Sequence, residues 1–140
     1  MDYQLVRSIN GFIIQEKKSK YEIDLRKRLI RFSVDIIKLL MTLPNKKELE
    51  VFKYQLSRSA TSIGANFEEA QSTSFKEFVQ KMRISLREAN ETRYWLQILS
   101  ELNIGNPNQR TELLNESKEI ALIFGSIVSK ADRKIKQNKK

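Results

Sequence analysis

The chain has 140 residues, a formal net charge of +9, and neither cysteine nor histidine. A chain of this length buries about 65–70% of its unfolded surface, which predicts one domain that folds without disulfides or a structural metal. The missing residue types exclude thiol nucleophiles, imidazole acid–base chemistry, Cys/His zinc sites and the Glu-x-x-His ligands of di-iron bundles, so no cofactor is expected. No stretch approaches the roughly 20 apolar residues of a membrane span, and no convincing signal peptide begins the chain, which indicates a cytoplasmic protein without a membrane partner.

The excess positive charge belongs to the two ends of the chain. Residues 1–43 carry nine basic and five acidic side chains, residues 104–140 carry eight and four, and the middle is close to neutral. Positive charge gathered in this way is typical of proteins that bind polyanions. Basic ends that serve only solubility are the alternative.

Four capping-box patterns divide the chain into segments. In this pattern a short polar side chain precedes a helix, and a Glu or Gln three residues later reaches back to it. The four pairs are Ser19 with Glu22, Asn45 with Glu48, Ser74 with Glu77, and Asn106 with Gln109, the last followed by a proline at the first helical position. They predict helices over 20–43, 46–73, 75–103 and 107–137, in one domain over 19–138 between an N-terminal arm or helix extension (1–18) and a basic tail end (139–140).

Each segment also carries an apolar stripe with steps of three and four residues, which places the stripe on one helix face. The stripes are Leu25, Leu29, Phe32, Ile36, Leu39 and Leu43; Leu49, Phe52, Leu56, Ala60, Ile63, Phe67 and Ala70; Phe75, Val79, Met82, Leu86, Ala89, Leu96 and Leu99; and Leu114, Ala121, Phe124, Val128, Ala131 and Ile135. Short connections between long helices favour antiparallel neighbours. The sequence therefore predicts an all-α fold, an antiparallel up-down-up-down four-helix bundle.

The second segment has a polar row beside its apolar stripe. Its members are Gln55, Ser59, Ser62, Asn66 and Glu69. Polar groups at the edge of a buried face are costly unless they have hydrogen-bond partners, so we expect this row to face another subunit. The serines, with Gly64 and Ala65 beside them, are typical of close helix approach, because no histidine is present to activate a serine.

The third segment carries a row in which two carboxylates lie between apolar and aromatic residues: Ile84, Glu88, Glu91, Trp95 and Ile98. One interpretation makes Glu88 and Glu91 a general acid and base or a metal pair, because burial beside an aromatic ring raises carboxylate pKa values. The favoured interpretation is that they pair with Arg58, Arg87 or Arg93 and hold two helices or two subunits in register.

These residues resemble a family of small bacterial four-helix-bundle proteins encoded in intervening sequences of 23S ribosomal RNA genes, also labelled ribosomal protein S23-like. The stretch 58–69, RSATSIGANFEE, is similar to the family's RRA-x-SI-x-ANI-x-E pattern, and 88–96, EANETRYWL, is similar to its EA-x-ET-x-YWL pattern. Ser74, Glu77 and Phe78 resemble the Ser-x-x-Glu-Phe start of the third helix. The resemblance covers about residues 20–130, with mild departures at Phe67 and Ala70.

The resemblance implies a homo-oligomer, a pentameric ring, with no established enzymatic activity. Related bundles are accessory proteins of diversity-generating retroelements, so the implied partners are RNA or DNA and a reverse transcriptase-like protein. Residues expected at the oligomer interface, or in the family motif, are Gln55, Arg58, Ser59, Ser62, Asn66, Glu69, Glu88, Glu91 and Trp95. Residues expected to contact nucleic acid are Lys20, Lys27, Arg31, Lys38, Lys130, Arg133, Lys134 and Lys136. Aromatic stacking platforms are not evident at positions expected to be exposed, which argues against dedicated single-strand recognition.

Three functions are compatible with these patterns. The leading hypothesis is a non-enzymatic scaffold that self-assembles and binds structured nucleic acid through its first and last helices, with strong salt dependence and little sequence preference. The second is a protein-interaction module that recruits a polymerase or another partner without nucleic-acid contact. The third is a hydrolase or metal enzyme that uses Glu88 and Glu91.

Overall fold

The structure, a computed structural model, describes residues 20–139. In this range the chain forms helices α2 (Lys20–Met41), α3 (Lys47–Ala70), α4 (Phe75–Leu102) and α5 (Pro107–Asn138). Both ends of each helix lie within about three residues of the predicted bounds. The predicted arm over 1–18 lies outside the described residues.

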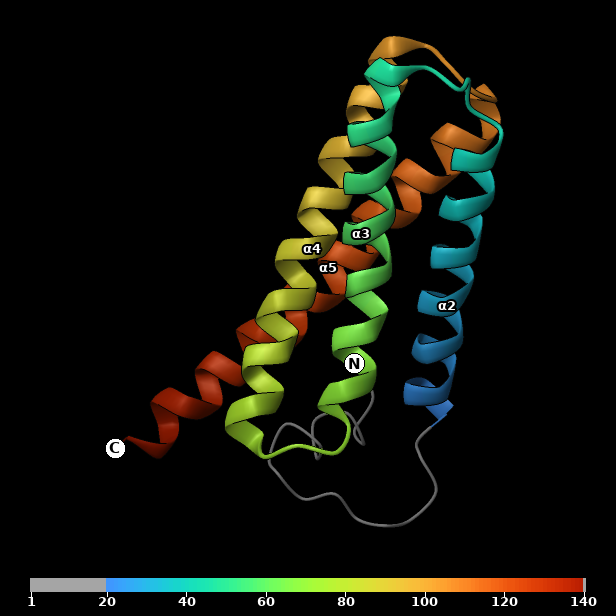
Figure 1. Cartoon of the computed structure of the whole chain (residues 1–140). Helices are drawn as coiled ribbons and strands as arrows, with labels where there is room; N and C mark the ends of the chain where they lie inside the picture. The colour runs from blue at the N-terminus through green and yellow to red at the C-terminus, as the bar shows by residue number, and fades with distance from the viewer. Residues whose placement is uncertain (1–19, 140) are drawn as a thin grey trace.

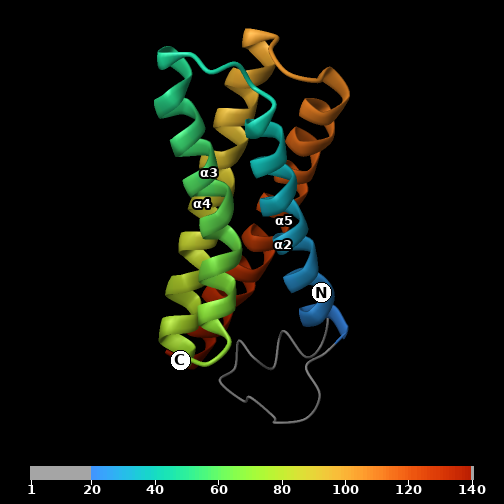
Figure 2. The same ribbon diagram turned by 45° about the vertical axis from the view of Figure 1, so that its right-hand side comes forward.

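The four helices alternate in direction, as Figure 1 shows. α3 packs against α4 and α4 against α5, while α2 lies against α3 and meets α5 over a shorter stretch. These neighbours confirm the predicted up-down-up-down bundle. α5 leans across the bundle, so its last turns extend past the beginning of α4, on the side away from α2 (Figures 1 and 2).

Two of the predicted helix caps are confirmed. The Ser74 hydroxyl accepts a hydrogen bond from the backbone N–H of Glu77, and the Asn106 side chain accepts one from Gln109. The predicted cap at Asn45 is wrong, because Lys46 is the residue before the first turn of α3 and makes no side-chain capping bond. The Lys46 N–H donates to the Pro44 carbonyl, so the connection turns one residue later than the pattern indicated. Ser19 lies outside the described residues.

The apolar stripes form one core. Every stripe residue of α2 through Leu39, and Leu43 just beyond the helix, is buried. In the other stripes only the end residues and Leu86, in the middle of the α4 stripe, are partly open. Phe67 of α3 and Phe124 of α5 meet edge to face, with ring centroids 6.1 Å apart, which joins helices that are not neighbours in sequence. Burying a large apolar side chain contributes about 1.5–3 kcal/mol, so these stripes supply the stability of the bundle.

A buried arginine closes the connection between α4 and α5, a feature that the sequence patterns did not indicate. The guanidinium of Arg110 donates to the Ile104 carbonyl oxygen at 3.1 Å and to the Asn103 side-chain oxygen at 3.0 Å. Asn103 has a left-handed backbone with φ of 54°, which ends α4 in the manner usual for a C-terminal cap. Gly105 has φ of 77°, and a Cβ there would lie 3.0 Å from Leu43, so only glycine fits this turn well.

Candidate functional site

The polar row of α3 lies along α4 of the same chain. The side chain of Ser59 is fully buried, and its hydroxyl lies 2.9 Å from that of Thr92. Ser85 of α4 donates to the Ile63 carbonyl oxygen at 2.9 Å. We call this contact, with its buried hydroxyls and the ion pairs described next, the α3–α4 seam.

An ion cluster continues the seam toward solvent. The guanidinium of Arg58 donates to both carboxylates, at 3.2 Å to Glu88 and 2.8 Å to Glu91. The indole N–H of Trp95 donates to Glu91 at 3.1 Å, and its ring meets Phe52 edge to face at 6.0 Å. The hydrogen bond to Glu91, followed by that to Glu88, raises the pKa of Arg58 above its ordinary value. Arg58 therefore stays charged throughout the physiological pH range.

This geometry matches the ion-pair interpretation of Glu88 and Glu91, with Arg58 as the partner. The cluster lacks a third acidic ligand, and no group of three or more potential metal ligands occurs anywhere in the described residues. Both carboxylates accept hydrogen bonds from Arg58, and Glu91 also accepts one from the indole N–H of Trp95, so side chains of the same chain already occupy their oxygen atoms. The contacts of this cluster link α3 to α4.

The expectation that the whole polar row faces another subunit needs correction. Ser59 has no exposed surface in the single chain, so it cannot touch another subunit. Glu69 pairs with Lys81 of α4 at 2.6 Å, but 62% of its side chain stays exposed, so its role in an interface stays a prediction. Helical spacing places a row on a face but does not say which neighbour covers that face, and here the neighbour is α4. Gln55, Ser62 and Asn66 remain half-buried, and a role for them in an interface stays a prediction.

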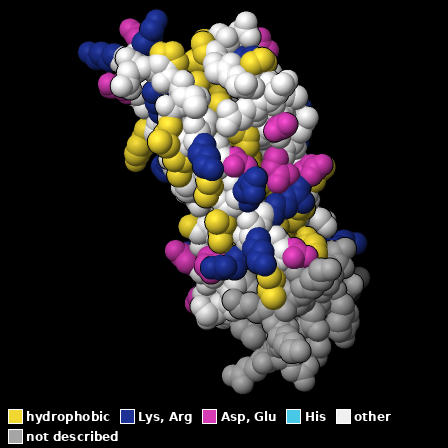
Figure 3. Space-filling view, turned by 90° about the vertical axis from the view of Figure 1, so that its right-hand side faces the viewer, with side chains coloured by type: hydrophobic (Ala, Val, Ile, Leu, Met, Phe, Trp, Pro, Cys, Tyr) yellow, Lys and Arg dark blue, Asp and Glu magenta, His cyan; other side chains and the backbone are white. Residues whose placement is uncertain are grey.

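A second apolar stripe on α2, which the sequence patterns above did not indicate, is exposed. It consists of Ile23, Ile30, Val34, Ile37 and Met41, with between 38% and 79% of each residue open to solvent. Steps of seven, four, three and four residues place these side chains on one face. Figure 3 shows hydrophobic side chains between charged ones on this side of the molecule.

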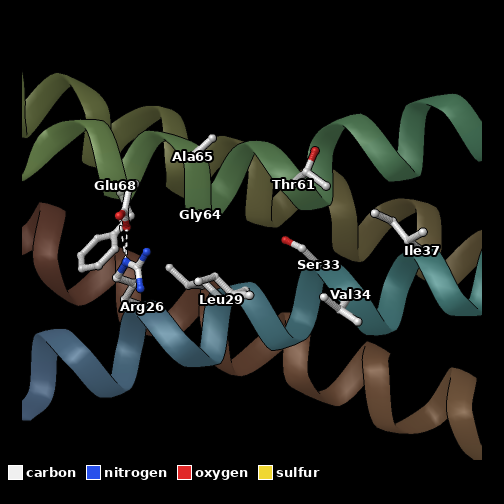
Figure 4. Close-up of a pocket in the computed structure, with 11 residues that line it drawn as sticks. Arg26, Leu29, Ser33, Val34, Ile37, Thr61, Gly64, Ala65 and Glu68 are labelled. Atoms are coloured by element: carbon white, nitrogen blue, oxygen red, sulfur yellow. Dashed lines mark hydrogen bonds and ion pairs between the residues drawn. The ribbon is translucent and has the colours of Figure 1, made fainter.

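Between this stripe and α3 lies a groove of about 340 Å³, which we call the α2–α3 groove. Ile30, Val34 and Ile37 line it from α2, and the small residues Thr61 and Ala65 line it from α3. Figure 4 shows the two helices facing each other across it, with the Arg26–Glu68 ion pair (2.8 Å) at one end. The lining is mainly apolar, as is typical of a docking surface.

Gly64 determines how closely α2 and α3 approach beside this groove. A Cβ at this position would lie 3.3 Å from the Cβ of Leu29. That distance is tighter than ordinary van der Waals contact, and a Cβ cannot rotate away. The prediction that Gly64 permits close helix approach is confirmed.

The predicted basic residues fall into two separate groups. Lys27, Arg31 and Lys38 are exposed on α2, where Arg31 pairs with Asp35. The α5 group lies on the last turns, across the bundle from the beginning of α2 (Figures 1 and 2): Lys130, Arg133, Lys134 and Lys136. The side chain of Lys20 lies outside the described ones. The expected nucleic-acid contacts therefore do not form one patch on a single chain.

Exposed tyrosines correct another expectation. Tyr54 on α3 is 65% exposed and Tyr94 on α4 is 61% exposed. Tyr94 meets Trp95 edge to face at 5.4 Å. Aromatic side chains are thus open to solvent, contrary to the expectation that stacking platforms are absent. The helical spacing did not indicate that these tyrosines are exposed, because each lies next to a residue of a row expected to be in contact: Tyr54 precedes Gln55, and Tyr94 precedes Trp95.

The fold and these surfaces define a four-helix-bundle protein whose notable features are an uncovered apolar groove and an internally paired polar seam. The sequence model of the 23S rRNA-intervening sequence protein family matches residues 21–126, and the chain belongs to that family. The sequence resemblance is thereby confirmed. The basic group on the last turns of α5 lies beyond the matched residues.

A solved structure gives the same result. The chain is similar to a protein of unknown function from the S23 ribosomal protein family of Bacteroides thetaiotaomicron, with 38% identity and a TM-score of 0.67 over 74% of this chain and 96% of that one. No curated protein matches the chain. Neither comparison indicates an enzymatic family. None of the helices within residues 20–139 is long and apolar enough to cross a membrane.

Proposed function

We propose that this protein is a non-enzymatic scaffold that self-associates through the α2–α3 groove and binds nucleic acid through its unpaired cations. The exposed apolar stripe of α2 beside the groove is the observation that supports the proposal most strongly. In a single chain, α2 buries one apolar face in the core and leaves a second, along nearly its whole length, open to water. In a chain with 31% charged residues, a continuous exposed apolar stripe is typical of a surface that another molecule covers.

A second copy of the chain is the occupant that fits best. The stripe from Ile23 to Met41 is about 27 Å long at the α-helical rise, so it matches a helix of α2's own length. Every copy carries both the stripe and the small-residue side of the groove, so identical subunits can cover each other's apolar surface. Pairing of this kind closes a dimer or, when head to tail, a ring. The family resemblance favours a ring of five subunits.

Unpaired cations support the nucleic-acid part of the proposal. Among the predicted contacts, Lys27, Lys38, Lys130, Arg133 and Lys134 make no ion pair with another described residue, and neither does Lys136. Repetition of the two basic groups around an assembly would bring groups from different subunits to the same polyanion. Binding of this type weakens steeply with salt, because each neutralised phosphate releases counterions.

Sedimentation velocity tests self-association. We expect the wild type to sediment as a species several times the 16.5 kDa mass of one chain. The double variant Val34→Glu/Ile37→Glu places two charges in the groove and should sediment as a single chain, with its helical circular dichroism unchanged. Leu122→Glu, on an exposed apolar residue of α5 outside the groove, is the matched control and should stay assembled. A wild type of 16.5 kDa at 100 µM, a concentration on the order of that at which weak specific interfaces form, would contradict the proposal.

Anisotropy titrations with labelled duplex and single-stranded RNA test nucleic-acid binding. The variant Lys27→Glu/Arg133→Glu should bind more weakly and with a shallower salt dependence, because it carries fewer phosphate contacts. Equal affinity in wild type and variant would show that Lys27 and Arg133 do not contact nucleic acid. A protein partner retained by the assembled protein without any nucleic acid would favour the interaction-module alternative.

A further inference from the structure

A surface pocket between α4 and α5 is lined by side chains of the kinds that bind nucleotides. The pocket has a volume of about 240 Å³ and is lined by Asn90, Arg93, Tyr94, Gln97 and Lys118. Two cations, an aromatic ring and two amides therefore surround one cavity. It lies outside the α2–α3 groove, and none of its residues is among the predicted nucleic-acid contacts.

Neighbouring ion pairs leave both cations of this pocket without a carboxylate partner. Glu91 is close in sequence to Arg93 but is held by Arg58 and Trp95. The carboxylates that flank Lys118, those of Glu116 and Glu119, both bind Arg28 of α2. Neither the side chain of Arg93 nor that of Lys118 makes a hydrogen bond or ion pair with any described residue, so both charges are available to an anion.

The aromatic ring of the pocket is exposed but held in place. Tyr94 is 61% exposed, and its edge-to-face contact with Trp95 restricts the ring. A preoriented exposed ring is a platform on which a base can stack at little entropic cost. The amide nitrogen of Gln97 donates to Glu101, which leaves the Gln97 carbonyl oxygen and the Asn90 side chain free to bond a base edge.

We propose that this pocket binds one nucleotide of a single-stranded nucleic acid. The base stacks on Tyr94, and the phosphate lies between Arg93 and Lys118. The amides tolerate several bases, because Asn90 offers both a donor and an acceptor and Gln97 offers an acceptor, so the site selects single strands rather than a sequence. The inference rests on the nucleic-acid-binding part of the proposed function and deepens it, since a stacked base must be unpaired.

The single tryptophan of the chain provides a local signal for this pocket. Trp95 is in contact with Tyr94, so a base stacked there should quench Trp95 emission. We would titrate the full chain with a ten-residue oligouridylate, excite the indole selectively and follow anisotropy of a labelled copy in parallel. We expect saturable quenching with the same midpoint as the anisotropy change.

Variants at the pocket separate stacking from charge. Tyr94→Ala should weaken binding about tenfold and Tyr94→Phe should retain it, because the ring face rather than the hydroxyl stacks. The double variant Arg93→Ala/Lys118→Ala should weaken binding and lower the salt slope by about one to two units, as expected for loss of one or two phosphate contacts. Tyr54→Ala and Lys47→Ala change an exposed tyrosine and an exposed lysine elsewhere and should bind like the wild type.

The outcomes distinguish this inference from the proposed function. Anisotropy that rises on RNA addition while Trp95 emission and the affinity of Tyr94→Ala stay unchanged would overturn the pocket but leave nucleic-acid binding intact. Inorganic polyphosphate that binds and quenches as well as the oligouridylate would also overturn it, because a base would not be needed. Absence of any RNA binding at low salt would overturn both.

Discussion

The two sides of α3 differ in the kind of contact that they make with the neighbouring helices. Toward α4, every buried polar side chain has a partner in the same chain, from the Ser59–Thr92 hydroxyl contact to the Arg58 ion pairs. Toward α2, the contact is mainly apolar apart from the Arg26–Glu68 ion pair at its end, depends on a glycine, and leaves a groove beside an exposed stripe. Polarity of a helix face therefore does not identify the surface that faces another subunit. In this chain the polar face is internally satisfied, whereas the apolar one is left unmatched.

This difference has a physical cause. Hydrogen bonds and ion pairs need precise partners, which a covalently connected neighbour supplies reliably, and an unpaired buried polar group costs about 1–3 kcal/mol. Apolar surface has no such geometric requirement and can be covered by any surface of suitable shape. Substitutions at the seam should therefore act mainly on the unfolding of one chain, and substitutions at the groove mainly on association.

Loss of the seam's tryptophan should give the largest effect. Trp95→Ala removes the edge-to-face contact with Phe52 and the hydrogen bond to Glu91, and we expect the free energy of unfolding to fall by about 3 kcal/mol. Urea denaturation at low protein concentration measures it. Trp95→Phe retains a ring and should lose about half as much. A wild-type midpoint for Trp95→Ala would show that the seam does not support the protomer.

The buried hydroxyl contact should give the next largest effect. Thr92→Val removes the partner of Ser59 and a bond to the Glu88 carbonyl oxygen, so we expect a loss of about 1–2 kcal/mol. Thr111→Val is a matched control, because Thr111 makes the same kind of bond four residues back, to Pro107, but is exposed. Its effect should stay within about 0.5 kcal/mol. Equal losses in both variants would indicate that burial at the seam adds nothing.

Two glycines in helix interiors compare the groove with a more open contact. Gly64→Ala places a Cβ 3.3 Å from that of Leu29 and forces α2 outward, so we expect a loss of about 1 kcal/mol despite the better helix propensity of alanine. Gly125→Ala meets only the end of Leu86 at 4.0 Å and should stabilise the protein by about 0.5–1 kcal/mol. Thermal unfolding of both variants measures the difference. A gain of equal size in both would mean that α2 is free to move away at no cost.

The smallest effect should come from the ion pair at the end of the groove. Arg26 and Glu68 are each about half exposed, at 46% and 49%, so Arg26→Ala should change the free energy of unfolding by no more than about 0.5 kcal/mol. Chemical denaturation in low and high salt measures it. A loss several times larger would indicate that this pair, rather than apolar packing, holds α2 on α3.

Sequence reasoning captured most of the fold because local signals agreed with one another. The caps at Ser74 and Asn106 and the four apolar stripes coincide with the observed helices and core. The cap at Asn45 failed because a one-residue change in the turn moves the capping position. The functional surfaces were harder to predict, since periodicity shows that a face exists but not what covers it. The second stripe of α2 has the required spacing and was detectable, whereas the pocket around Tyr94 depends on how α5 lies against α4.

Hydrogen exchange at increasing protein concentration tests most directly whether the α2–α3 side is the surface completed by another copy. We expect exchange to slow with concentration in peptides that cover residues 26–37 and 61–68, and to stay constant in those that cover 88–95 of the seam. Exchange in 26–37 that is independent of concentration, or slowing confined to 88–95, would contradict the assignment of the groove as the self-association surface.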